Sequence, residues 1–206
     1  MSEIKIVDNF LHSFHKKELE NKVMGDSDIC WSFLRNFVFN DYETYAKFQA
    51  NDENIITPTF GTFIHYMLDD NMPNPSKIYN LFENFPRLIE SKFDVKIKKI
   101  TRLRLNLVHP IGFLSDKYAA PHVDSFTQNE KIFIYYLSNS DGDTVLFNEL
   151  HTLAEAQLDF NKKTILQRVD YKQGRAILFD AHRYHGMIFP SKKVRIIVNM
   201  NLILDN

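Results

Sequence analysis

Hydrophobic and polar residues alternate along much of the second half of the chain. From residue 95, the run VKIKKITRLRLNLV places polar and apolar side chains on opposite faces, which is the pattern of a half-buried β-strand. Four later runs are also strand candidates: KIFIYYLS (131–138), DTVLFNE (143–149), RAILFDA (175–181) and VRIIVNMNLIL (194–204). Turn-forming residues lie at 139–142 and 172–174. The pattern predicts an antiparallel sandwich or barrel.

The first 94 residues follow a more helical and irregular pattern. A first helix, ended by Gly25, is predicted from the spacing of Leu11, Phe14, Leu19 and Val23. Ser76 is predicted to cap a second helix, kinked or divided at Pro86, whose apolar face contains Ile78, Leu81, Phe82, Phe85, Leu88, Ile89 and Phe93. Residues 26–74 show little period, apart from a short strand within TPTFGTFIHYM. We therefore expect one α+β, mainly β domain over 1–206, with a helical support region (1–94) and a β core (95–206).

Composition narrows the class of protein. Net charge is −1 and the pI is about 6.7, so no broad basic field favours a nucleic-acid partner. The single cysteine, Cys30, excludes an internal disulfide framework. The N-terminal residues do not resemble a signal peptide, and no run is apolar enough to span a membrane. The expectation is a cytoplasmic protein without membrane association.

One histidine has a neighbour that suggests chemistry. His122 precedes Asp124 by two residues, and on a strand such residues point to the same face. Two histidines and one carboxylate form a facial triad that leaves open positions on Fe(II), and His182 and His185 are both candidates for the third ligand. Arg195 opens the last strand and could hold a dicarboxylate through a two-pronged, charge-assisted pair.

In this order, these residues resemble the signature of the 2-oxoglutarate/Fe(II)-dependent dioxygenases, most closely the prolyl-4-hydroxylase-like branch. IYYLSN (134–139) followed by DGDT (141–144) resembles a hairpin of that branch, and GRAILFD (174–180) resembles the strand before its distal histidine. The resemblance covers roughly residues 100–202, and residues 1–100 only loosely resemble the helical support of small bacterial and phage members. It implies a double-stranded β-helix (jelly roll) buttressed by N-terminal helices. Gly142-Asp143 replaces the usual Gly-Gly pair, and residues 104–109 lack the tyrosine that many members carry.

The resemblance also implies roles. His122, Asp124 and His185 would bind Fe(II), with His185 preferred over His182 because members separate this histidine from the arginine by about ten residues. Arg195 would hold the distal carboxylate of 2-oxoglutarate, and Tyr136 would donate a second hydrogen bond to it.

Strand parity adds polar candidates. Asn199 shares a face with Arg195, and Arg104 and Asn106 share a face opposite a row of leucines that is expected to pack on the helices. These three side chains are expected to line the pocket, and an outer or solvated strand face is the alternative.

The implied activity is hydroxylation of an unactivated C–H bond, with 2-oxoglutarate and O₂ consumed, succinate and CO₂ released, and ascorbate helpful. The branch favours peptidyl proline or another protein side chain as substrate. A free amino acid or metabolite, or an inactive metal-binding jelly-roll module, are the alternatives. Nucleic-acid demethylases carry an arginine where this chain has Asn201, which disfavours them. Segments 116–120 and 149–163 are candidates to frame the substrate, with His151, Lys162 and Lys163 expected to be solvated.

Overall fold

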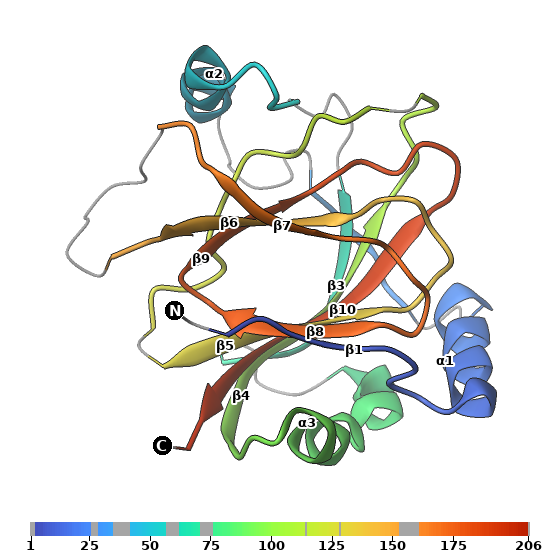
Figure 1. Cartoon of the computed structure of the whole chain (residues 1–206). Coiled ribbons are helices and arrows are strands. Elements are labelled where there is room, and N and C mark those ends of the chain that lie inside the picture. Colours follow the sequence, from blue (N-terminus) through green and yellow to red (C-terminus); the bar gives the residue numbers. More distant parts are fainter. Residues whose placement is uncertain are drawn as a thin grey trace.

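Two antiparallel β-sheets lie face to face and form the core of the structure (Figure 1). The computed structural model describes residues 3–25, 29–34, 42–56, 62–70, 76–113, 115–127, 129–152 and 161–205. Within these ranges, the larger sheet has seven strands in the order β1 (Lys5–Val7), β8 (Ala176–Asp180), β5 (Glu130–Tyr136), β10 (Arg195–Leu204), β4 (Ile97–Val108), β3 (Thr62–Asp69) and β2 (Ser32–Leu34). The smaller sheet has the order β7 (Ile165–Val169), β6 (Thr144–Leu150) and β9 (Arg183–Met187).

Residues 118–122 extend the smaller sheet along the free edge of β9. The amide of Ala119 donates to the carbonyl of Met187 (2.8 Å), and His122 forms an antiparallel bridge with His185. From β4 onward the chain therefore alternates between the sheets: β4, residues 118–122, β5, β6 with β7, β8, β9 and β10. This alternation is the double-stranded β-helix that the sequence predicted, so the predicted fold class is confirmed.

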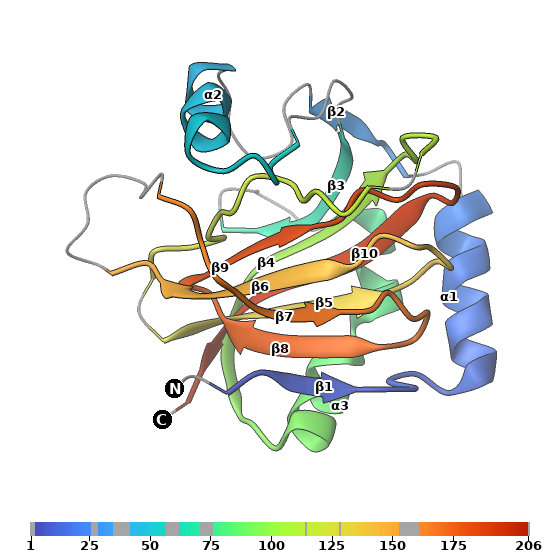
Figure 2. The same cartoon turned by 45° about the horizontal axis from the view of Figure 1, so that its top comes forward.

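Helices cover the outer face of the larger sheet (Figure 2). Buried residues of α1 (Ser13–Gly25), of the 3₁₀-helix η1 (Lys77–Phe82) and of α3 (Phe85–Phe93) join Leu103 and Leu105 of β4 in one hydrophobic cluster. The leucine face of β4 therefore packs on the helices, as predicted. On the smaller sheet, Phe48 of α2 (Tyr42–Asn51) packs in a second cluster with Tyr118 and Phe147.

The central strands bury both faces. In β5, Phe133 and Tyr135 join the cluster under the helices, whereas Ile132, Ile134 and Tyr136 pack between the two sheets. The apolar run KIFIYY is explained by this arrangement, because a strand covered on both sides has no face that needs to be polar.

The N-terminal third departs from the sequence prediction. It supplies β1, β2 and β3 to the larger sheet, so residues 1–94 are more than a helical support region, and α2 forms where little period was seen. β7 and β9 were not predicted as strands. The predicted strand near residues 57–67 is β3, which begins at Thr62; residues 57–61 lie outside the described part of the chain.

The predicted helices are correct in place but differ in detail. The hydroxyl of Ser76 accepts a hydrogen bond from the amide of Ile78 (3.4 Å), as expected of a cap, but the helix that it starts is only a short 3₁₀-helix. Pro86 lies in the first turn of α3, where its missing N–H costs little, and so divides the two helices. Phe14, which was predicted to face the core, is 68% exposed. None of the helices in the described ranges is long and apolar enough to cross a membrane.

The cluster under the helices should dominate stability. Phe133 is fully buried and contacts the rings of Phe10, Phe85 and Phe93. Phe133→Ala is expected to lower the free energy of unfolding by about 3–5 kcal/mol, measured by urea denaturation. The matched control is Phe14→Ala at the exposed position, with an expected change within about 0.5 kcal/mol. Equal effects of the two substitutions would contradict this assignment of the core.

Candidate metal centre

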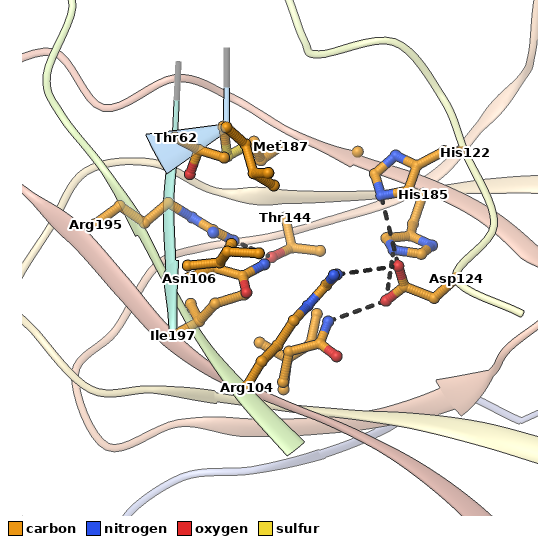
Figure 3. Close-up of a pocket in the computed structure, with 15 residues that line it drawn as sticks. Thr62, Arg104, Asn106, His122, Asp124, Thr144, His185, Met187, Arg195 and Ile197 are labelled. Carbon is orange, nitrogen blue, oxygen red and sulfur yellow. Dashed lines mark hydrogen bonds and ion pairs between the residues drawn. The ribbon is translucent and has the colours of Figure 1, made fainter. Parts of the chain in front are cut away.

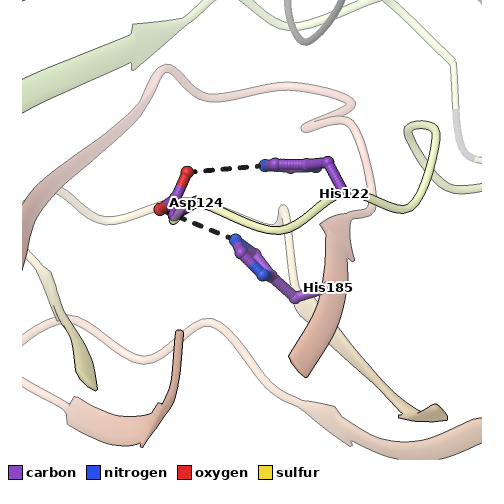
Figure 4. A group of neighbouring side chains, drawn as sticks. All are labelled: His122, Asp124 and His185. Atoms are coloured by element: carbon purple, nitrogen blue, oxygen red, sulfur yellow. Dashed lines mark ion pairs between the residues drawn. The ribbon is translucent and has the colours of Figure 1, made fainter. Parts of the chain in front are cut away.

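Three side chains with metal-binding atoms converge between the two sheets. Nε2 of His122 lies 3.9 Å from Oδ1 of Asp124, and Nε2 of His185 lies 3.8 Å from Oδ2 of the same carboxylate (Figure 4). The three candidate ligand atoms are all within 4.8 Å of one another. The structure thus brings together the two histidines and the aspartate that the sequence singled out.

The backbone fixes the distance between the two histidines. His122 and His185 exchange both main-chain hydrogen bonds (3.0 and 2.9 Å), so their side chains leave a directly opposed pair. Gly186 permits this approach, because a Cβ atom at this position would lie only 2.8 Å from the carbonyl oxygen of Ala119. Glycine therefore follows His185 because a larger residue would prevent the 118–122 segment from pairing with β9.

Both imidazoles have the tautomer that a metal ligand needs. Nδ1 of His122 is 3.2 Å from the carbonyl oxygen of Ala120, and Nδ1 of His185 is 3.1 Å from that of Arg183. Because a carbonyl only accepts hydrogen bonds, each Nδ1 carries the proton and each Nε2 presents its lone pair toward Asp124. The donor set of two neutral imidazoles and one carboxylate fits a divalent transition metal.

Burial and charge set the protonation states. Burial, reinforced by the neighbouring imidazole, lowers the pKa of His122 to about 3, and burial also lowers the pKa of His185. For Asp124, burial alone would raise the pKa, but the guanidinium groups of Arg102 and Arg104 outweigh it and hold the pKa well below its usual range. At neutral pH the cluster is therefore two neutral imidazoles and one carboxylate.

Two strands of the larger sheet hold Asp124 in place. Nδ2 of Asn199 on β10 donates to Oδ2 (3.0 Å), and Arg102 and Arg104 on β4 each place a guanidinium nitrogen 3.4 Å from Oδ1. Asn199 and Arg104 are opposed residues in the β10–β4 pairing. The predicted inward face of Asn199 and Arg104 is therefore the face that contacts the carboxylate.

Arg195 lies at the other end of the same cavity (Figure 3). Its side chain is buried, with Nε donating to the carbonyl of Gly142 (2.9 Å) and Nη2 to the hydroxyl of Thr144 (3.1 Å). Gly142 must be small, because a Cβ there would lie 2.9 Å from both Cδ of Arg195 and the carbonyl oxygen of Ile188. Within the described ranges this guanidinium forms no ion pair with a carboxylate, so its charge is available to a ligand in the cavity.

Thr144 is a site residue that sequence reasoning missed. Its Oγ1 accepts hydrogen bonds from Arg195 and from the hydroxyl of Tyr136 (2.7 Å), which occupies both of its lone pairs. Its own O–H must then donate elsewhere, and Thr144 lines the cavity. The available signal was its position at the start of a strand directly after the 139–142 turn.

The position of Tyr136 differs from its predicted role. Its ring is buried between the sheets, stacked on Tyr171 with ring centroids 4.3 Å apart, and it does not line the cavity. Its hydroxyl donates to Thr144 and also lies 3.5 Å from the carbonyl oxygen of Val169. Tyr136 therefore positions Thr144 in this structure, and its contact with a bound carboxylate stays a prediction.

The other predicted site residues fall into those that line the cavity and one that lies outside the metal cluster. Arg104, Asn106 and Asn199 line the cavity, so the alternative of a solvated strand face does not apply to them. His182 is not in the cluster, because its Nε2 contacts the carbonyl of Thr127 (2.9 Å).

Two segments that were expected to frame the substrate are arranged differently. Residues 118–120 are buried and continue the smaller sheet, so the 116–120 segment is not an open loop at the cavity. Of the 149–163 segment, residues 153–160 lie outside the described ranges. His151 and Lys163 are buried against Tyr184 rather than solvated, whereas Lys162 is largely exposed.

Comparisons with solved structures identify the fold. A Pseudomonas putida prolyl-4-hydroxylase superposes with a TM-score of 0.51 at 11% identity, covering 100% of this chain and 94% of that one. A Trichoplax adhaerens prolyl hydroxylase, in complex with a hypoxia-inducible-factor peptide, gives 0.58 at 16% identity, covering 97% and 83%. The non-heme α-ketoglutarate-dependent epimerase SnoN gives 0.62 at 9% identity, covering 98% and 78%.

The fold is that of the 2-oxoglutarate/Fe(II) oxygenases. No protein-family model matches the sequence, and no curated protein matches it. At these identities the likeness establishes the fold, and any inference about chemistry rests on the site.

The close approach at Gly186 can be tested by substitution. Gly186→Ala is expected to lower the free energy of unfolding by about 1–3 kcal/mol, because the added methyl forces the 118–122 segment away from β9. Gly25→Ala is the control, since a Cβ there meets nothing within 4 Å. Urea denaturation measures both changes, and an equally small effect at the two glycines would show that the contact with Ala119 relaxes freely.

Proposed function

We propose that this chain is a 2-oxoglutarate- and Fe(II)-dependent oxygenase that hydroxylates an unactivated C–H bond. The observation that carries the proposal is a single cavity with two complementary ends. One end holds the cluster of His122, Asp124 and His185, and the other holds the buried guanidinium of Arg195. A keto acid with a second carboxylate can span such a cavity, and a simple metal-binding module would not need the arginine.

In this proposal, His122, Asp124 and His185 hold the metal ion through Nε2, one carboxylate oxygen and Nε2. Asn199 positions the carboxylate through its hydrogen bond to Oδ2, which leaves Oδ1 facing Nε2 of His122. Three protein ligands leave open positions on Fe(II) for a chelating co-substrate and O₂. Bound Fe(II) and 2-oxoglutarate would supply the oxidation, in which O₂ is consumed, 2-oxoglutarate becomes succinate and CO₂, and a substrate C–H bond becomes C–OH.

The chain's own residues bind and orient the co-substrate. Arg195 pairs with the distal carboxylate of 2-oxoglutarate, and Thr144 donates its remaining hydroxyl hydrogen to the same group. Ile134, Ile197 and Met187 line the cavity with apolar surface. They exclude water from the space between the two ends, which strengthens both electrostatic contacts.

The substrate is the open part of the proposal. Among the neighbours of this fold, the Trichoplax enzyme is in complex with a peptide, whereas SnoN belongs to nogalamycin biosynthesis. Peptidyl proline, another protein side chain and a small molecule are therefore the candidate substrate classes. An inactive metal-binding jelly-roll module is the non-enzymatic alternative, and the two experiments below separate it from an oxygenase.

The first experiment tests the metal ligands. Wild-type protein should bind one Fe(II) or Mn(II) ion in anaerobic calorimetry and, with Fe(II), ascorbate and 2-oxoglutarate, release succinate slowly without added substrate. His122→Ala and Asp124→Ala should each weaken metal binding by at least about a hundredfold, beyond the 10–100-fold effect of residues that only support a ligand. Succinate release should be lost with it.

His182→Ala is the matched control, because this histidine lies outside the cluster. It should retain metal binding and succinate release. Full metal affinity in Asp124→Ala would refute the ligand assignment. Metal binding without any binding of 2-oxoglutarate would favour the inactive module.

The second experiment tests the carboxylate end. Arg195→Ala should raise the dissociation constant of 2-oxoglutarate about tenfold to several hundredfold, because charge-assisted hydrogen bonds contribute about 1.5–3 kcal/mol each. Metal affinity should change little, since Arg195 contacts no proposed ligand. Arg195→Lys should restore binding only in part, because an ammonium cannot reproduce the planar fork.

Lys192→Ala is the control for the loss of a positive charge near Arg195, because Lys192 is exposed. Titration of the Mn(II)-loaded proteins with 2-oxoglutarate measures all three variants. Unchanged affinity in Arg195→Ala would mean that the distal carboxylate binds elsewhere. Loss of both metal and 2-oxoglutarate binding would instead make Arg195 a structural residue.

A further inference from the structure

A second cationic group, Arg102 with Arg104, lies beside the candidate metal centre rather than beside Arg195. Arg102 and Arg104 follow one another on the inner face of β4, opposite Asn201 and Asn199 of β10. Arg104 lines the cavity and reaches Asp124, whereas Arg195 lies beside Thr144 (Figure 3). The function proposed above gives Arg195 a ligand but leaves this pair of arginines without one.

The inner face around this pair has unused hydrogen-bonding capacity. In the described ranges, eight buried side-chain nitrogen and oxygen atoms have no hydrogen-bond partner, and six of them belong to this face. They are Nε and Nη2 of Arg102, Nε of Arg104, and the amide oxygens of Asn106, Asn199 and Asn201; of these, Nη2 of Arg102 has an ion-pair contact with Oδ1 of Asp124. Folded proteins rarely leave such atoms unpaired, so their concentration at one place points to a polar ligand.

The charges of this face are also unbalanced. Both guanidinium groups pair with the same carboxylate, that of Asp124, at 3.4 Å each. Their side chains are only 19% and 15% exposed, so bulk water screens them poorly. If Asp124 also ligates a divalent cation, as the proposed function requires, its single negative charge must offset the charge of the cation as well as that of the two arginines. Water can satisfy hydrogen bonds but cannot neutralise the excess positive charge, whereas an anion does both.

The chemistry of the unpaired atoms indicates which anion. A forked guanidinium matches a carboxylate, and the nearby amide oxygens can accept hydrogens from an ammonium or hydroxyl group. An internal proline of a peptide has no charged group to place against the two arginines.

We propose that the substrate is a small carboxylic acid, such as a free amino or hydroxy acid, whose carboxylate pairs with Arg104 and Arg102 beside the metal. The hydroxylation of this acid rests on the proposed function. The binding of an anion at Arg104 does not depend on it. This proposal selects the small-molecule class over the peptidyl class. It also makes Arg104 a substrate-binding residue rather than a second contact for 2-oxoglutarate.

Direct binding tests the proposal without relying on turnover. The probes are the proteinogenic amino acids and a set of short-chain hydroxy acids, each compared with its own carboxamide, and a proline-containing peptide with both termini blocked. Calorimetric titration of Mn(II)-loaded protein with 2-oxoglutarate present should find at least one acid that binds at least about tenfold more tightly than its carboxamide. The same acid should raise succinate release above the rate without substrate and gain one oxygen atom by mass spectrometry.

Variants on the same strand provide the matched comparison. Arg104→Met should weaken binding of that acid about tenfold to a hundredfold and remove its preference over the carboxamide. The preference is the readout, because any change at the metal centre through Asp124 affects the acid and its carboxamide alike. Arg104→Lys should retain part of the preference. Lys98→Met, which removes an exposed positive charge from β4, should behave as wild type.

Each remaining outcome is decisive. The proposal is overturned if no acid binds, if acids and carboxamides bind alike, if Arg104→Met keeps the preference, or if the blocked peptide alone is hydroxylated. Should the protein bind neither metal nor 2-oxoglutarate, the same titrations without them still report on the anion site. Acid binding that depends on Arg104 would then support the site while the oxygenase function fails.

Discussion

The candidate metal centre depends on one backbone contact, the antiparallel bridge between His122 and His185. This bridge joins a segment without regular strand structure of its own to the edge of β9, and it sets the separation of two candidate ligands through main-chain hydrogen bonds. The third ligand follows at once, because Asp124 is two residues beyond His122. The site is therefore a product of the closure of the smaller sheet. That closure in turn requires a residue without a side chain at position 186, where the backbone of Ala119 passes.

The larger sheet carries buried positive charge on its inner face and apolar side chains on its outer face. Along β4, Leu103 and Leu105 pack under the helices while Arg102 and Arg104 face inward. Partly burying two guanidinium groups opposes folding, and the helix-covered face compensates with a continuous apolar cluster. The helices thus support the function indirectly. Their apolar contacts with the outer face offset the free-energy cost of the polar inner face. Without that cost, strands covered on both sides would be expected to be apolar on both faces.

Much of this architecture could be predicted from local sequence patterns. One period-two run and four further strand-like runs identified five strands, and parity placed Arg104, Asn106 and Asn199 on the inner face, because that information lies within each strand. The strands β1 and β2 span three residues each, too short to show a period, and β9 reads RYHGM, which has no apolar alternation. The role of Thr144 depends on the pairing of β6 with distant segments. Such register is set by long-range contacts, which local patterns do not encode.

The two ends of the cavity differ in how their positive charge is held, and this difference has a consequence for selectivity. Arg195 donates hydrogen bonds to the carbonyl of Gly142 and to Thr144. Neither partner carries a charge, so the positive charge of Arg195 can pair with a ligand. Arg104 is partly neutralised by Asp124, so an anion beside it competes with the carboxylate that is the proposed metal ligand. A dicarboxylate should therefore prefer the Arg195 end, where no carboxylate of the described residues forms an ion pair with the guanidinium. An anion should bind most tightly beside Arg104 after a metal ion has bound Asp124, because the carboxylate then neutralises the arginine less. In the proposed function, that order of attraction would place the co-substrate at the Arg195 end and leave the Arg104 end for the substrate.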